Sequence, residues 1–253
     1  METPTPPNYW LMLREALVVR ELPRMALQVP DLARQPRGEG QPVLVFPGFG
    51  ASDASTLLLR SYLTWLGYGV RGWGLGTNRG NVRRLVPAVI ELVEAAAEKS
   101  GQTVRLVGWS LGGVLARETA RERPHLVERV ITMGTPVVGG PKYTAVARRY
   151  RERGHDLDAI EAAMASRDEV PIRVPVTAIY TRSDGVVAWQ ACIDRANPDV
   201  EHIEVDTTHI GLGINPDVYR IVAQRLSRRR EAAAGATKER GKRQAKRPRV
   251  RGG

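Results

Sequence analysis

The sequence lacks the residues and segments that mark disulfide-bonded, zinc-binding and membrane-spanning proteins. It contains one cysteine, Cys192, which excludes a disulfide within the chain, and no cluster of cysteine and histidine suggests zinc. No apolar run approaches the roughly 18 residues needed to cross a bilayer. The first ten residues, METPTPPNYW, lack the basic segment that opens a secretory signal. We therefore expect a cytoplasmic protein that holds no metal.

Most of the chain also has little net charge, because the basic residues gather at its end. The net charge is +11, and residues 228–253 contain eleven lysines and arginines but two glutamates. This composition, poor in apolar residues and self-repelling, predicts a disordered tail. The tail is either a solvated segment that aids solubility or a weak, non-specific contact for nucleic acid or an anionic membrane. Because it has no aromatic residue to stack on bases, we do not expect sequence-specific nucleic-acid binding.

What remains has the composition of an ordinary globular domain. The chain has 253 residues, of which 42% are hydrophobic and 26% charged, enough for one sizeable core. Residues 1–40 contain an amphipathic stretch at 10–22, followed by a proline-punctuated linker. We predict a helix on the outside of a domain that spans residues 41–227.

Within that domain, short β-type runs alternate with helical patterns. PVLVFPG at 42–48 is continuously apolar, which is typical of a strand buried on both faces. Strands are also predicted at 68–73, 103–109, 126–134, 174–181 and 200–206, and helices at 53–66, 82–99, 111–122 and 216–227. This alternation favours right-handed βαβ units. We predict an α/β fold with a mostly parallel, six-stranded sheet flanked by helices.

The motif VGWSLGG at 107–113 places Ser110 where a predicted strand turns into a helix. The Gly-x-Ser-x-Gly pattern also arises by chance, so its position carries the argument. Sites in parallel sheets lie beyond the carboxyl ends of the strands, and Ser110 directly follows the third strand. A serine on so tight a turn needs small residues two positions to either side, which Gly108 and Gly112 supply. We predict that Ser110 is a nucleophile.

A serine hydroxyl is a poor nucleophile without a base, and one of the four histidines is placed to act as one. His209, in DTTHIGLG, is the one that falls in a loop after a strand end. The imidazolium also needs a carboxylate, and Asp184 in IYTRSDGVV again follows a strand, although Asp-Gly is an ordinary turn signal too. Asp194 and Asp206 are weaker candidates. Three strand ends thus supply Ser110, Asp184 and His209.

Two backbone amides are candidates for stabilising the oxygen on which negative charge would develop. One is the amide of Leu111, directly after the nucleophile. The other comes from FPGFGASD, where Gly48 and Gly50 allow the backbone of Phe49 to approach closely. A plain strand-to-helix turn would favour the same glycines.

These motifs, in this order, resemble those of the α/β-hydrolase superfamily in its lipase and esterase branch. PVLVFPGFG, LVGWSLGG, ITMGTP, IYTRSDGVV and HIGLGINPDVY cover roughly residues 42–226. The resemblance implies a Ser110–Asp184–His209 triad, oxyanion amides from Phe49 and Leu111, and no metal or organic cofactor. The six strands begin at what would be the family's third, so the first hairpin is missing. Pro47-Gly48 also replaces the His-Gly of many lipases.

An insertion at about 137–174 is expected to form a small helical cap over the site. It reads as two short amphipathic helices, and Tyr143, Leu157 and Ile160 lie on the apolar stripes that would bind an acyl group. The other interpretation is that these stripes pack on the core. The loop GLGTNRG at 74–80 predicts either a pocket wall, with Asn78 as a polar contact, or a glycine-rich turn.

The function that these residues favour is hydrolysis of a small-molecule carboxylic ester through an acyl-enzyme. An acyltransferase would use the same residues, with an alcohol or thiol in place of water. A non-catalytic binding protein on this fold is the third hypothesis, because fold does not dictate function. The intact triad argues against it, since binding alone needs no such set.

Overall fold

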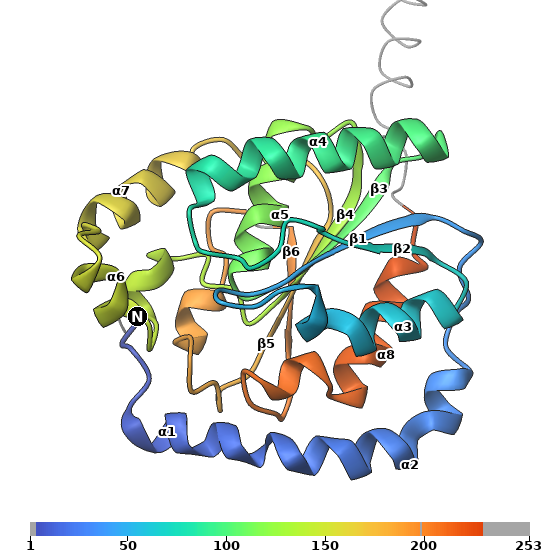
Figure 1. The fold of residues 1–253 in the computed structure, drawn as a ribbon, viewed down its shortest axis with the longest axis horizontal. Helices are drawn as coiled ribbons and strands as arrows, with labels where there is room; N and C mark the ends of the chain where they lie inside the picture. The colour runs from blue at the N-terminus through green and yellow to red at the C-terminus, as the bar shows by residue number, and fades with distance from the viewer. Residues whose placement is uncertain (1–3, 198, 230–253) are drawn as a thin grey trace, which may run out of the picture.

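The central sheet has six strands, all parallel, in the order β2-β1-β3-β4-β5-β6 (Figure 1). This computed structural model describes residues 4–197 and 199–229. The strands are β1 (Pro42–Phe46), β2 (Gly69–Gly72), β3 (Val104–Trp109), β4 (Val127–Met133), β5 (Val176–Tyr180) and β6 (Val200–Glu204). Each lies within a predicted strand, and the prediction of a parallel α/β sheet is confirmed.

Helices cover both faces of the sheet, as a strand that is apolar along its whole length requires. All five residues of β1 are buried. Val43 and Val45 belong to one hydrophobic cluster, whereas Leu44 and Phe46 belong to another. The first cluster lies under α3 (Leu57–Trp65) and α8 (Pro216–Leu226), and the second under α4 (Val82–Ser100) and α5 (Leu111–Glu122) (Figure 1).

The ends of these helices follow the sequence signals. Gly101 adopts the left-handed conformation, with a φ of 65°, and ends α4. Asn215 caps α8, since its side-chain oxygen accepts hydrogen bonds from the amides of Asp217 and Val218. Short 3-10 turns complete the framework: η1 (Glu15–Arg20), η2 (Asp53–Thr56), η3 (Gly140–Tyr143), η4 (Trp189–Cys192) and η5 (Gly211–Gly213).

The N-terminal segment runs along the outside of the molecule as α1 (Tyr9–Arg14), η1 and α2 (Glu21–Ala33), and we call it the N-terminal arm (Figure 1). The prediction of a linker after residue 22 is wrong, because α2 continues to Ala33. Pro23 is tolerated in the first turn of α2, where its missing N–H leaves no intrahelical bond unmade. Pro30 lies inside the helix, near its end, where it leaves one carbonyl of the preceding turn without its intrahelical donor.

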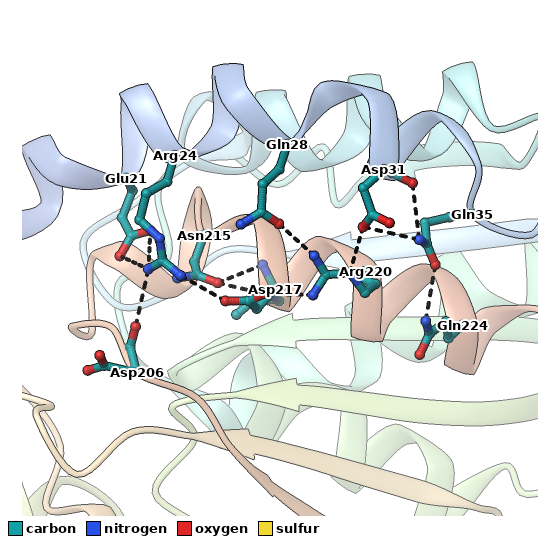
Figure 2. A network of polar contacts seen from close by, with 11 residues as sticks. Glu21, Arg24, Gln28, Asp31, Gln35, Asp206, Asn215, Asp217, Arg220 and Gln224 are labelled. Atoms are coloured by element: carbon teal, nitrogen blue, oxygen red, sulfur yellow. Dashed lines mark hydrogen bonds and ion pairs between the residues drawn. The ribbon is translucent and has the colours of Figure 1, made fainter.

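Polar contacts with α8 fix α2 in place (Figure 2). Arg220 of α8 contacts the Asp31 carboxylate at 2.7 Å and the Gln28 side-chain oxygen at 2.5 Å. Arg24 of α2 forms an ion pair with Asp217 of α8 at 2.9 Å. The proline-rich stretch is therefore held as a helix by its partner.

The predicted cap is present between β4 and β5 as η3, α6 (Ala147–Glu152) and α7 (Leu157–Asp168). Ala147, Tyr150 and Leu157 form a small hydrophobic cluster, against which Phe49 packs. The cap thus rests on the loop that follows β1.

Two further predictions concern the ends of the chain and membranes. Residues 230–253, nearly all of the predicted tail at 228–253, lie outside the described residues. Among residues 4–197 and 199–229, no helix has the length and apolarity to span a membrane.

Candidate active site

Ser110 occupies a strained turn between β3 and α5. Its φ of 53° and ψ of −122° make it the one non-glycine residue with a positive φ in the described chain. Such a conformation costs on the order of 1–3 kcal/mol and occurs where function demands it. A side chain at Gly108 would collide with the backbone of Gly113, and one at Gly112 with the carbonyl of Phe46. Both glycines are thus sterically required, as predicted.

Asp184 and His209 meet after β5 and β6. The Asp184 Oδ2 atom lies 2.7 Å from His209 Nδ1, and both side chains are buried. The other carboxylate oxygen accepts hydrogen bonds from the amides of Val186, at 2.8 Å, and Val187, at 2.6 Å. Because the carboxylate can only accept, it holds the proton on Nδ1 and leaves Nε2 with a free lone pair.

The surroundings of His209 favour its protonated form. Burial by itself lowers the pKa of the imidazole, but the Asp184 carboxylate raises it through charge and through the hydrogen bond. The Glu15 carboxylate raises it further, and the net shift of the pKa is upward from the ordinary 6.5. The ring is therefore set to take up a proton readily.

Gly134 and Trp109 lie against His209 and help to hold it in place. Gly134, which follows β4 with a φ of 56°, passes so close that a Cβ there would lie 2.9 Å from His209 Nδ1. The indole N–H of Trp109 donates to the His209 carbonyl at 3.2 Å. The loops after β3, β4 and β6 thus fit together around one imidazole.

Sequence reasoning missed Glu15, which joins the loops that carry Asp184 and His209. Its Oε1 accepts from the amides of Gly185, at 2.7 Å, and His209, at 3.0 Å, and its Oε2 from that of Ile210, at 2.8 Å. The carboxylate is buried although it comes from the N-terminal arm. An acidic residue in an amphipathic stretch was the available signal, but nothing in the sequence named its partners.

A second buried carboxylate of the arm, Glu21, holds the same loop further along. The Thr207 hydroxyl donates to its Oε1 at 2.7 Å, and the Asn215 amide donates to its Oε2 at 2.9 Å. The segment between β6 and α8 is thus bound to the arm through four of its residues, Thr207, His209, Ile210 and Asn215.

The loop after β1 passes directly beside Ser110. A Cβ on Gly48 would lie 3.2 Å from the Ser110 Cβ, so the next amide, that of Phe49, is brought near the serine. Leu111 opens α5, and the first amides of a helix have no partner within it. Gly48 therefore lies beside Ser110, and Leu111 directly follows Ser110 along the chain.

Asn78 supports this loop instead of contacting the cavity, which corrects the expectation of a polar contact with substrate. It is fully buried, and its side-chain N–H donates to the Pro47 carbonyl at 2.9 Å. Its backbone exchanges hydrogen bonds with Gly50 and Ala51 at 2.7 and 2.8 Å. The turn at 74–80 therefore fixes the position of the Phe49 amide.

A cavity of about 1010 Å³ extends from Ser110 and His209 beneath the cap. Its enclosed wall is mostly apolar, and it is lined by Val86, Val114, Val137, Ile160 and Met164 among others. Ile160 lies where it was predicted, whereas Tyr143 and Leu157 do not line the cavity. The Tyr143 hydroxyl donates to Glu161, and Leu157 packs inside the cap.

The remaining candidates lie apart from this constellation. Asp194 forms a buried ion pair with Arg117, and Asp206 is exposed. His155, which the sequence placed in a polar segment, lines the cavity beside Tyr150. Burial raises the pKa of the Cys192 thiol well above its ordinary value, so this cysteine stays protonated. No group of three or more metal-ligating side chains forms in the described part of the chain.

No model of a known protein family and no curated protein matches the sequence. Solved structures do resemble the fold. A monoacylglycerol lipase of Paleococcus ferrophilus is 18% identical with a TM-score of 0.53, over 74% of this chain and 95% of its own. A structure from work on the metagenome-derived lipolytic enzymes LipS and LipT is 15% identical with a TM-score of 0.58, over 76% and 94%.

A mouse protein, α/β-hydrolase domain-containing protein 10, is 19% identical with a TM-score of 0.50, over 75% of this chain and 89% of its own. At sequence identities this low, the similarity is one of backbone fold. Together with the six parallel strands and the strained turn at Ser110, it shows that the chain has the α/β-hydrolase fold.

Proposed function

We propose that this protein is a serine hydrolase that cleaves carboxylic esters through an acyl-enzyme. The observation that carries the proposal is the strained Ser110 turn, which opens into the same cavity as the hydrogen-bonded Asp184–His209 pair. Strain at one residue is retained where a reactive group must be presented. The lipase and the lipolytic enzymes among the similar structures support the same chemistry.

In the first half-reaction, the Ser110 oxygen attacks the ester carbonyl while His209 Nε2 takes its proton. The negative charge that forms on the carbonyl oxygen is stabilised by the amides of Phe49 and Leu111, each worth about 3 kcal/mol in comparable sites. The tetrahedral intermediate then collapses, and the imidazolium donates its proton to the departing alcohol. Asp184 stabilises the imidazolium throughout.

In the second half-reaction, water replaces the alcohol. His209 takes a proton from the water as it attacks the acyl-enzyme, and the same two amides again hold the oxyanion. Collapse of this intermediate releases the carboxylic acid and returns the proton to Ser110.

Labelling with a fluorophosphonate tests this proposal directly, because the probe reacts with activated serines. We expect the full chain to be labelled, Ser110→Ala to lose the label, and His209→Ala to be labelled far more slowly. Ser61→Ala, which removes an exposed serine of α3, is the control and should label normally. A folded wild type that takes no label, or a Ser110→Ala variant that keeps it, would contradict the proposal.

A further inference from the structure

The edge of the Ser110 cavity carries a cluster of three arginines. Arg149 lies on α6 and Arg153 directly follows it as the C-cap residue, and each guanidinium carbon lies 5.9 Å from the centre of the Phe49 ring. Arg83, in the first turn of α4, lines the cavity. None of the three forms an ion pair with a residue of the described chain.

Six acidic residues of the surrounding elements α5, α6 and α7 are paired with other cations. Glu152 of α6 pairs with Arg148, which is one residue from Arg149. On α5, Glu118 and Glu122 pair with Arg167, and on α7, Asp168 pairs with Arg121. The acids Asp158 and Glu161 of α7 both hold Lys142. Glu118, Glu122 and Asp168 line the same cavity, but each is paired with an arginine other than Arg83, Arg149 and Arg153.

This cluster lies next to the atoms that would react. Phe49, on whose ring two of the arginines lie, is also the residue whose amide flanks Ser110 in our proposal. Gly80 packs on the same ring, since a Cβ there would lie 2.8 Å from it. A group bound by Arg149 and Arg153 would thus lie on the loop that follows β1 and passes beside Ser110.

Apolar and cationic groups around the cavity suit the two parts of one substrate. Val86, Val114 and Val137 are buried and offer an enclosed apolar wall, which suits an acyl chain. Arg83, Arg149 and Arg153 are exposed, so they lie where a leaving group must pass into solvent. Planar guanidinium groups bind phosphate oxygens through paired, charge-assisted hydrogen bonds.

We propose that the substrate is an acyl ester or thioester whose leaving group carries phosphate, and that Arg83, Arg149 and Arg153 bind that phosphate. The apolar acyl group occupies the interior, and the phosphate-bearing alcohol or thiol lies across Phe49. This inference rests on the proposed function, since it assigns the substrate class of the same site.

Two thioesters with the same acyl group and the same scissile bond provide the test: S-butyryl-coenzyme A, which carries phosphates, and S-butyryl-N-acetylcysteamine, which does not. We expect the full chain to prefer the first by kcat/KM on the order of ten-fold or more at low salt. The preference should shrink as added salt screens the arginines. It should fall toward unity in the Arg149→Gln/Arg153→Gln variant and be reduced in Arg83→Gln.

Arg151→Gln is the matched control. Arg151 lies on the same helix and is exposed, but unlike Arg149 and Arg153 it does not lie over the Phe49 ring, so the preference should survive its loss. A wild type that cleaves both thioesters equally well would overturn this inference and leave the proposed hydrolase standing. A preference that persists in the Arg149→Gln/Arg153→Gln variant would also overturn it, because other cations would then be responsible.

A binding measurement separates this inference from the proposed function. Free coenzyme A should bind the Ser110→Ala variant by calorimetry, and the Arg149→Gln/Arg153→Gln substitutions should weaken that binding on the order of ten-fold. Arginine-dependent binding in a protein that takes no fluorophosphonate would support the phosphate site while contradicting the hydrolase. Fluorophosphonate labelling without any arginine-dependent binding would do the reverse.

Discussion

Glu15 concentrates three backbone amides from two loops on one buried carboxylate. Its bonds to Gly185, His209 and Ile210 tie the turn of Asp184 to that of His209, so the 2.7 Å contact between those two side chains depends on a residue of the N-terminal arm. Its negative charge also raises the pKa of His209. Glu15 is thus a positioning residue with an electrostatic effect on the base.

We predict that Glu15→Gln shifts the acid limb of the kcat/KM profile to lower pH. The base works when unprotonated, and removing a nearby negative charge lowers the pKa of His209, so activity persists further into acid. One amide also loses its acceptor, which should cost about 1–3 kcal/mol of unfolding free energy. The profile and a urea titration measure the two effects. If Glu15→Gln is destabilised but the acid limb of its kcat/KM profile does not move, Glu15 has a structural role alone.

At this scale, the sequence reveals the residues that topology brings together but not those that reach the site from elsewhere. Ser110, Asp184 and His209 were predictable because the carboxyl ends of parallel strands share one edge of the sheet. Glu15 comes from a segment that precedes the sheet, so no strand-end argument finds it. Asn78 was predicted as a pocket contact because the sequence does not tell which way a loop side chain faces.

At the scale of elements, strands and helices with a clear apolar periodicity were predicted within a few residues. The range of α5 was predicted in full, since a strand with a glycine elbow precedes it and its periodicity ends at Glu122. The failure lies in α2, where proline signals predicted a linker. Local proline signals gave the wrong result because the contacts of α2 with α8 are non-local and cannot be read along the chain.

Among the residues of α8, Arg220 makes the contacts on which the packing of α2 against α8 most depends. We predict that Arg220→Ala lowers the unfolding free energy by about 1 kcal/mol, because three partners on two helices lose a half-buried cation. Urea denaturation measures the change. Arg148→Ala, which removes an exposed pair within one helix, should alter it by less than about 0.5 kcal/mol. Equal losses in the two variants would show that the α2–α8 network adds nothing.

At the scale of the whole molecule, the raised pKa of His209 makes the free energy of unfolding depend on pH. This free energy falls as the pH rises, whereas catalytic activity increases. The protonated imidazole is favoured in the folded chain over the unfolded one, in which the pKa is near 6.5. Its stabilisation is complete below that value and is lost as the pH rises through the folded pKa. Activity needs the neutral imidazole and therefore appears as that stabilisation disappears.

We predict that the difference in unfolding free energy between wild type and His209→Gln is larger at about pH 5.5 than at about pH 9. Urea titrations of the two proteins across this range measure it, and Arg148→Ala supplies a reference whose difference should not vary with pH. A difference that stays constant or grows toward alkaline pH would mean that the folded protein does not favour the imidazolium.

The bonds of Glu15 and Glu21 also bear on when the site comes into being. Synthesis runs from the N-terminus, so the two carboxylates leave the ribosome long before the amides and hydroxyl that they bind, at 185 and 207–215. The Ser110 turn and the loop beside it are made in between. A nascent chain that has reached Ser110 therefore has no anchored base until residues 207–215 have also been made, and the site is complete only when that segment binds Glu15 and Glu21 of the N-terminal arm.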